Sequence, residues 1–116
     1  MIAIRGELSF EDEVVSLSGV TIYVRLMDVS RADAAASTVS EYRISSLPAG
    51  TNTSYKINFE LTADVVDSRG SYILAAHVDL DGDGKVSIGD YITKESFPIS
   101  VQSPSAYYAV RVRRVT

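Results

Sequence analysis

The sequence of 116 residues contains no cysteine, which excludes disulfide bonds, thiolate metal sites and a cysteine nucleophile. It has only three prolines and no tryptophan. No apolar run approaches the ~18 residues that a helix needs to span a bilayer. The N-terminus also lacks the charged and apolar regions of a secretory signal peptide. Either the protein is cytosolic, or its targeting segment is absent from this chain.

The chain also lacks a strong overall charge. It has 15 acidic residues and 11 Lys and Arg, for a formal net charge of -4. Four of the acids lie within residues 79–90, and the remaining 11 equal the number of basic residues. The acidity is thus confined to one segment, and the balanced remainder gives no indication of nucleic-acid binding.

Helical periodicity is nearly absent, whereas alternation of apolar and polar residues recurs along the chain. Its length and a hydrophobic content of 46% predict a single folded domain over residues 1–116. The expected strands are residues 2–10, 20–26, 39–44, 55–61, 72–78, 91–99 and 107–115. About seven short strands separated by turns predict an all-β fold, a single antiparallel β-sandwich. The alternation predicts a core that contains Ile22, Val24, Leu26, Ile57, Phe59, Leu74 and Val78.

Residues 79–90, which we call the acidic loop, read D-L-D-G-D-G-K-V-S-I-G-D. This spacing matches the twelve-residue calcium loop of EF-hands. The predicted calcium ligands are Asp79, Asp81, Asp83, the Lys85 carbonyl, Ser87 and Asp90. Gly84 falls at the sixth position, where a sharp turn favours glycine. β-branched and aromatic residues flank the loop in place of helices, so we expect calcium to stabilise a hairpin rather than to drive a switch.

Two details of the acidic loop qualify this prediction. The last position is Asp90 rather than glutamate, and its shorter side chain predicts weak calcium binding, with a dissociation constant of roughly 10⁻⁴–10⁻³ M. Val86 is apolar, and we expect it to anchor the loop to the core. The alternative interpretation is a polar Asp-Gly hairpin without an ion, since both residues favour turns.

The only histidine and a group of arginines near the C-terminus can each be explained either by a functional site or by an ordinary surface position. His77 is the only histidine, and we expect a surface imidazole next to the acidic loop rather than a metal ligand or a base. No nucleophile motif accompanies it, so an enzyme is not expected. Arg111, Arg113 and Arg114 suit either an acidic surface, such as lipid headgroups, or protection of a strand edge.

Several segments resemble the YbaY/YscW-like lipoprotein family of small bacterial envelope domains. They are V-R-L-M-D-V-S-R-A-D-A at residues 24–34, I-N-F-E-L at residues 57–61 and Y-I-L-A-A at residues 72–76. The resemblance implies a β-sandwich and a non-catalytic accessory role, since the named branch consists of pilotins, which escort secretin subunits to the outer membrane. It further implies location in the cell envelope and an envelope protein as partner.

Two functions therefore follow from the sequence. The first is an envelope accessory or protein-interaction domain that carries a structural calcium loop. The second is a calcium-dependent carbohydrate-binding or adhesion module, in which the ion holds a recognition loop or contacts the sugar.

Overall fold

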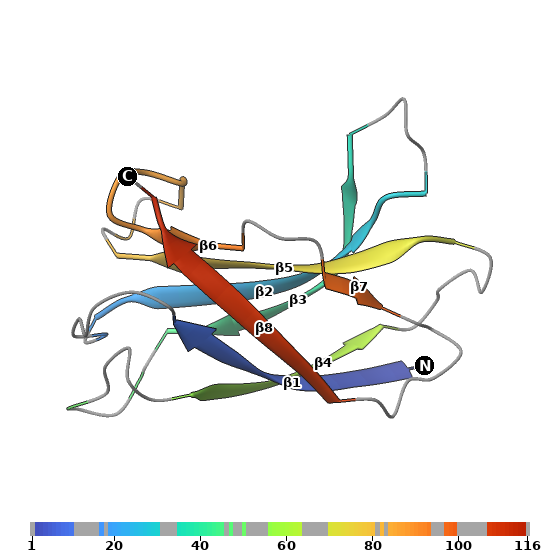
Figure 1. Cartoon of the computed structure of the whole chain (residues 1–116), viewed down its shortest axis with the longest axis horizontal. Helices are drawn as coiled ribbons and strands as arrows, with labels where there is room; N and C mark the ends of the chain where they lie inside the picture. The colour runs from blue at the N-terminus through green and yellow to red at the C-terminus, as the bar shows by residue number, and fades with distance from the viewer. Residues whose placement is uncertain are drawn as a thin grey trace.

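The computed structural model describes residues 2–10, 17, 19–30, 35–45, 47, 50, 56–63, 70–80, 82, 84–93, 97–99 and 107–115. Eight strands cross it (Figure 1): β1 (Ile2–Phe10), β2 (Thr21–Asp28), β3 (Ser37–Ile44), β4 (Ile57–Ala63), β5 (Tyr72–Asp79), β6 (Tyr91–Ile92), β7 (Phe97–Ile99) and β8 (Tyr107–Arg114). Every described element is a strand, which confirms the predicted all-β class. Accordingly, the described part of the chain offers no helix with the length and apolarity that crossing a bilayer requires.

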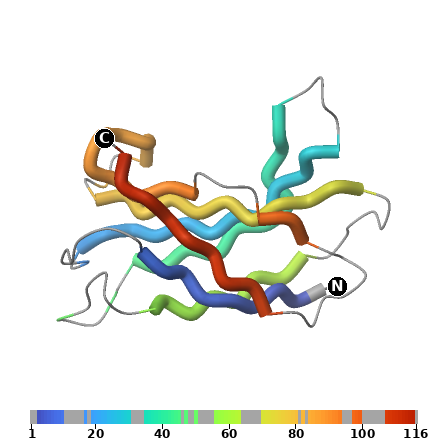
Figure 2. Tube along the Cα trace, in the orientation of Figure 1, coloured from blue at the N-terminus to red at the C-terminus, as the bar shows by residue number. Residues whose placement is uncertain are grey.

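The strands form one sheet in the order β3-β2-β5-β6-β8-β1-β4, with β7 paired to β5. The sheet curls into a nearly closed barrel, so that its two halves face each other across the core (Figure 2). The halves are β3-β2-β5 and β8-β1-β4, and the two-residue strand β6 joins them. We call the boundary between β3 and β4 the seam; there the Ser40 hydroxyl donates a hydrogen bond to the Thr62 carbonyl.

The core lies between the two halves, as the alternation predicts. Strand β4 buries every second residue, and strand β2 buries Ile22, Val24 and Leu26 on its inner face. All seven residues predicted for the core are buried. The core is thus set by period-2 patterning.

Two pairings differ from a simple antiparallel arrangement. Strand β1 pairs with β8 in parallel, because the first and last strands lie side by side and run in the same direction. The single strand predicted at residues 91–99 is two short strands, of which β6 pairs with β5 and β8, and β7 pairs with β5. Pairing to two neighbours lets β6 bridge the halves of the sheet.

Gly6 is the point where three strands approach most closely. It pairs with Phe59 on β4 and with Tyr108 on β8. A Cβ atom at Gly6 would lie 2.7 Å from Phe59 Cζ and would overlap the Tyr108 carbonyl oxygen. The missing side chain therefore makes room for the Phe59 ring.

We predict that Gly6→Ala lowers the free energy of unfolding by about 1–3 kcal/mol, because overlap in a packed core outweighs the better strand propensity of alanine. Urea denaturation measures the change. Ala109→Ser, at an exposed position on neighbouring β8, is the control and should unfold like the original protein. Equal stability of Gly6→Ala would contradict this account of the β1 packing.

Candidate functional site

The acidic loop connects β5 to β6 and lies beside the end of β8. Its first and last residues, Asp79 and Asp90, are each only 1% exposed. Gly89 N–H donates to the Val115 carbonyl at 2.9 Å, and Val115 N–H donates to the Asp90 carbonyl at 2.7 Å. The last two residues of the loop are therefore fixed to the chain directly after β8, and its first residue, Asp79, is part of β5 and pairs with Thr21.

The Asp79 carboxylate accepts two hydrogen bonds from backbone N–H groups in the first half of the loop. Oδ1 accepts a hydrogen bond from Gly82 N–H at 3.1 Å, and Oδ2 accepts one from Gly84 N–H at 2.7 Å. Gly82 and Gly84 have φ values of +74° and +76°. Left-handed backbone at Gly84 confirms that this position requires a turn for which glycine is best suited.

The Asp90 carboxylate organises the second half of the loop. Oδ1 accepts from Leu80 N–H at 3.0 Å, and Oδ2 accepts from Ser87 N–H at 3.2 Å. His77 Nε2 lies 2.8 Å from the same Oδ2. A carboxylate is only an acceptor when ionised, so Nε2 carries the hydrogen in this pair.

Opposing effects set the acidity of Asp90. Burial by itself would raise the pKa of this carboxyl, but the hydrogen bonds from His77, Leu80 and Ser87 outweigh burial and hold the pKa below its ordinary value. Asp90 is therefore ionised at neutral pH, with its charge matched by donors on three sides.

The prediction that His77 is a surface imidazole is wrong. The residue is 5% exposed, and its ring stacks on Tyr23 with 5.8 Å between ring centroids and 20° between ring planes. It is buried because the acidic loop returns Asp90 to the end of β5. The Ser87 hydroxyl donates a hydrogen bond at 3.4 Å to Asp90 Oδ2, the carboxylate oxygen that His77 Nε2 also contacts.

The six predicted calcium ligands divide into three groups. Asp79 and Asp90 are brought together, and ligand atoms of His77, Asp79 and Asp90 all lie within 4.8 Å of one another. Ser87 contacts Asp90, whereas the side chain of Lys85 is exposed. Asp81 and Asp83 lie outside the described residues. The described part of the loop thus presents two convergent carboxylates, the oxygen donors that a hard cation prefers.

Val86 does not anchor the loop to the core, contrary to the prediction. It is 55% exposed, and Ile88 is 83% exposed. Hydrogen bonds to Asp79, Asp90 and Val115 hold the loop, and Leu80 rather than Val86 is the loop residue that packs against the core.

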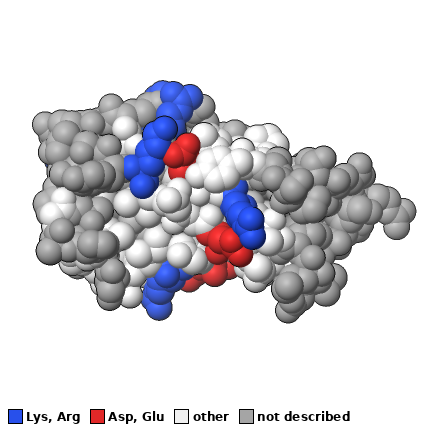
Figure 3. Space-filling view, turned by 90° about the horizontal axis from the view of Figure 1, so that it is seen from below, with Lys and Arg blue, Asp and Glu red and all other residues white. Residues whose placement is uncertain are grey.

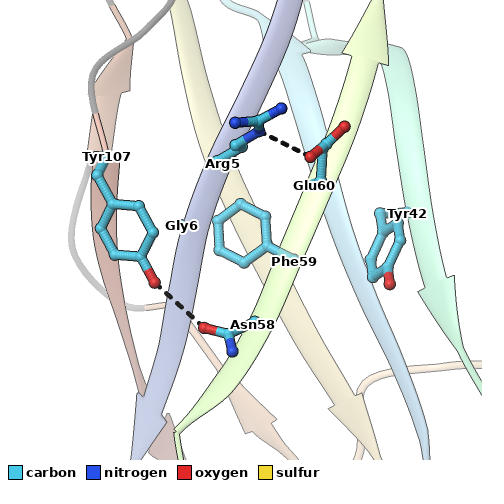
Figure 4. A pocket seen from close by; sticks show the side chains of 7 residues that line it. All are labelled: Arg5, Gly6, Tyr42, Asn58, Phe59, Glu60 and Tyr107. Atoms are coloured by element: carbon cyan, nitrogen blue, oxygen red, sulfur yellow. Dashed lines mark hydrogen bonds and ion pairs between the residues drawn. The ribbon is translucent and has the colours of Figure 1, made fainter.

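A second feature, which the sequence did not indicate as a site, is a hollow of about 290 Å³ beside the seam (Figure 4). Its lining comes from β1, β3, β4 and β8: Arg5, Gly6, Tyr42, Asn58, Phe59, Glu60 and Tyr107. The only signal in the sequence was Gly6 inside a strand, because a strand glycine often marks a close approach. We call this hollow the seam groove.

Hydrogen bonds define the rim of the seam groove. Tyr107 Oη donates to Asn58 Oδ1 at 3.2 Å across β1, and Arg5 Nε donates to Glu60 Oε2 at 2.7 Å. Tyr107 is nevertheless 59% exposed. On the face seen from below, basic and acidic side chains lie next to one another rather than in a single-sign patch (Figure 3). The groove therefore offers aromatic surface framed by paired charges, which suits a polypeptide better than a polyanion.

Comparison with known proteins agrees with the all-β fold described above. A sequence profile of the family "Type III secretion system lipoprotein chaperone (YscW)" matches residues 1–102, so the chain belongs to this family. Its fold is similar to that of an alternative pilotin from the type II secretion system of Vibrio cholerae, with a TM-score of 0.75 and 19% sequence identity. That match covers 98% of this chain and 96% of the pilotin. No curated protein matches the sequence.

We predict that Asp90→Asn lowers the free energy of unfolding at pH 7 by about 1–3 kcal/mol, because an amide leaves buried donors poorly matched. The folded-state pKa of Asp90 is depressed, so the stability from its charge is present above about pH 3.9 and is lost as pH falls through the folded-state pKa. The difference in the free energy of unfolding between the original protein and Asp90→Asn should therefore become smaller below about pH 4. Urea titrations at several pH values measure it. Glu60→Gln, an exposed carboxylate, should show little loss. A difference in the free energy of unfolding that does not change with pH would contradict the stabilising role of the ionised Asp90 carboxylate.

Proposed function

We propose that this protein is a non-catalytic accessory domain of the bacterial cell envelope that binds a segment of a secretin subunit. Two findings support the proposal. The family is one of secretion lipoprotein chaperones, and the fold is that of a pilotin. A chaperone of this kind needs a surface for a polypeptide rather than a reaction centre.

The seam groove is the observation that carries the proposal. Along the seam the described residues show a side-chain hydrogen bond from Ser40 to the Thr62 carbonyl, and no strand pairing joins β3 to β4 there. Tyr42 from β3 and Phe59 from β4 line the groove on the two sides of the seam. Phe59 is a core residue, and Tyr107 on β8 is the exposed aromatic side chain of the lining. Aromatic side chains with a polar rim are typical of the anchoring centre of a protein interface.

We predict that Asn58→Arg weakens capture of secretin subunits at least tenfold, because a longer charged side chain fills the groove and displaces Tyr107. The measurement is co-purification from detergent extracts of the source bacterium's envelope, with the secretin identified by mass spectrometry. Ser71→Arg is the matched control, since residue 71 is exposed just before β5, in the other half of the sheet and outside the groove lining. Equal losses of secretin capture in both variants, or no loss in either, would exclude the seam groove as the binding site.

We further propose that the acidic loop binds one calcium ion through Asp79, Asp81, Asp83, the Lys85 carbonyl, Ser87 and Asp90. Support comes from the two buried carboxylates at its ends and from the left-handed Gly84. The carboxylates of Asp79 and Asp90 also accept backbone hydrogen bonds within the loop, and the core owes nothing to an ion, so calcium would add stability to a domain that is already folded. Its contribution then follows RT ln(1 + [Ca²⁺]/Kd), about 1.4 kcal/mol at ten times Kd.

We predict a heat of binding and a rise in melting temperature at millimolar calcium, with little effect of magnesium, because the loop does not impose a tight octahedron. Asp79→Asn should abolish the calcium-dependent rise, whereas Glu41→Gln, a carboxylate paired with Arg25 on the outer face, should preserve it. Calorimetry and thermal melts in calcium or EDTA provide the readout. Identical curves in both would favour the ion-free hairpin.

A further inference from the structure

Two arginine side chains lie against one tyrosine ring on the outer face of β2 and β3. Tyr23 and Arg25 are two residues apart on β2, and Arg43 lies opposite Tyr23 on β3. The guanidinium carbons of Arg25 and Arg43 are 4.8 Å and 5.2 Å from the centre of the Tyr23 ring. The Tyr23 ring is itself fixed, because it is buried and stacks on His77. It therefore holds two cations in place, which we call the arginine pair.

Most hydrogen-bond donors of the arginine pair are unused. Arg25 donates from Nε to Glu41 Oε2 at 2.9 Å, and Arg43 donates from Nη2 to the Tyr23 hydroxyl at 3.4 Å. Each guanidinium has five N–H groups, and the described residues offer the arginine pair no further acceptor. Arg43 is exposed and forms no ion pair with a described carboxylate. Its remaining N–H groups are therefore available to a ligand.

The charge around the arginine pair is also unbalanced. Glu41 is the one carboxylate that the described residues of β2 and β3 place beside it, and Glu41 is bonded to Arg25. The buried carboxylate of Asp90 bonds the edge of the His77 ring rather than either arginine. One cation is thus left over, and two like charges this close repel each other. Two guanidinium groups that share one carboxylate are suited to bind a second oxyanion.

Strand β3 places the arginine pair next to the seam groove. Successive side chains of a strand point to opposite faces. Tyr42 packs against the core and lines the groove, whereas its neighbours Glu41 and Arg43 are exposed on the outer face. Strand β3 is also the end strand of the sheet. A polypeptide held against Tyr42 therefore has to cross only the width of one strand, roughly 5 Å, to reach Arg43.

We propose that the arginine pair binds an acidic side chain of the secretin segment that occupies the seam groove. This inference rests on the proposed function and adds the chemistry of the partner, an aspartate or glutamate close to the residue that enters the groove. The planar fork of a guanidinium matches both oxygens of a carboxylate. Arg43 supplies the main contact, because Arg25 already holds Glu41.

Capture of secretin subunits at about 0.05 M and about 0.5 M NaCl tests this contact. Arg43→Gln should lower capture about fivefold at low salt, the upper range for an exposed ion pair. The loss should nearly disappear at high salt, because salt screens exposed charges. Arg43→Lys should recover part of the loss, since an ammonium group keeps the charge without the fork.

The matched control is Arg113→Gln, the same change at an exposed position where β8 pairs with β6, on the side of the sheet away from the seam. It should capture secretin like the original protein. Thermal melts confirm that each variant is folded.

A tetraglutamate peptide with blocked ends tests the chemistry without a secretin. In NMR titrations at low salt, it should shift the Nε–H signals of Arg25 and Arg43 and leave that of Arg113 unchanged. Inorganic phosphate at the same total anionic charge should shift them less. A larger effect of phosphate would assign the arginine pair to a phosphate-bearing ligand and overturn the proposal.

The capture experiment separates this proposal from that of the seam groove. Equal capture by the original protein and Arg43→Gln at low salt, with loss in Asn58→Arg, would overturn the role of the arginine pair and leave the groove in place. Loss in Arg43→Gln with none in Asn58→Arg would support the arginine contact and exclude the groove. A loss in Arg43→Gln that is the same at both salt concentrations would also overturn the proposal, by assigning Arg43 to packing on Tyr23. Failure of the original protein to capture any secretin would overturn both.

Discussion

The hydrogen bonds of one buried residue, Asp90, link the two halves of this protein through its carboxylate on one side and its backbone carbonyl on the other. Asp90 binds the imidazole of His77 on β5 and backbone donors of its own loop, and its carbonyl accepts from Val115 after β8. The next residue, Tyr91, begins β6, is fully buried and packs edge-on against Phe10 at 5.2 Å. A two-residue strand is too short to connect two sheets by its own ladder. The buried charge of Asp90, which contacts His77 and accepts from Leu80 and Ser87, positions the residue whose carbonyl reaches Val115.

This arrangement gives the acidic loop a structural role. His77 is fixed between Asp90 and the ring of Tyr23, and the guanidinium groups of Arg25 and Arg43 lie 4.8 Å and 5.2 Å from the centre of that ring. The cations cover a tyrosine that would otherwise face solvent. On the outer face of the sheet, which does not contact the core, hydrogen-bonding, stacking and cation–π contacts thus hold these side chains in place of apolar packing.

The loop and the seam groove lie in different parts of the barrel and serve different purposes. The loop joins the halves where β6 bridges them, whereas the groove lies at the boundary where β3 and β4 remain unpaired in the described structure. A pilotin-like chaperone needs a stable frame and a surface that accepts a polypeptide. In the proposed function, the side of the sheet closed by β6 belongs to the frame, and the seam groove is the surface that we assign to the polypeptide.

The sequence by itself determined the all-β class, the core residues and the glycine turn at Gly84, because each depends on local spacing or local backbone conformation. It predicted the convergence of Asp79 and Asp90 for the same reason. Only the tertiary structure decided the rest. His77 is buried and Val86 is exposed because the loop is held by contacts with Val115, 25 or more residues away in the sequence. The residues that line the seam groove come from four strands that are far apart in the sequence. No local sequence pattern predicts which strands remain unpaired when a sheet curls on itself.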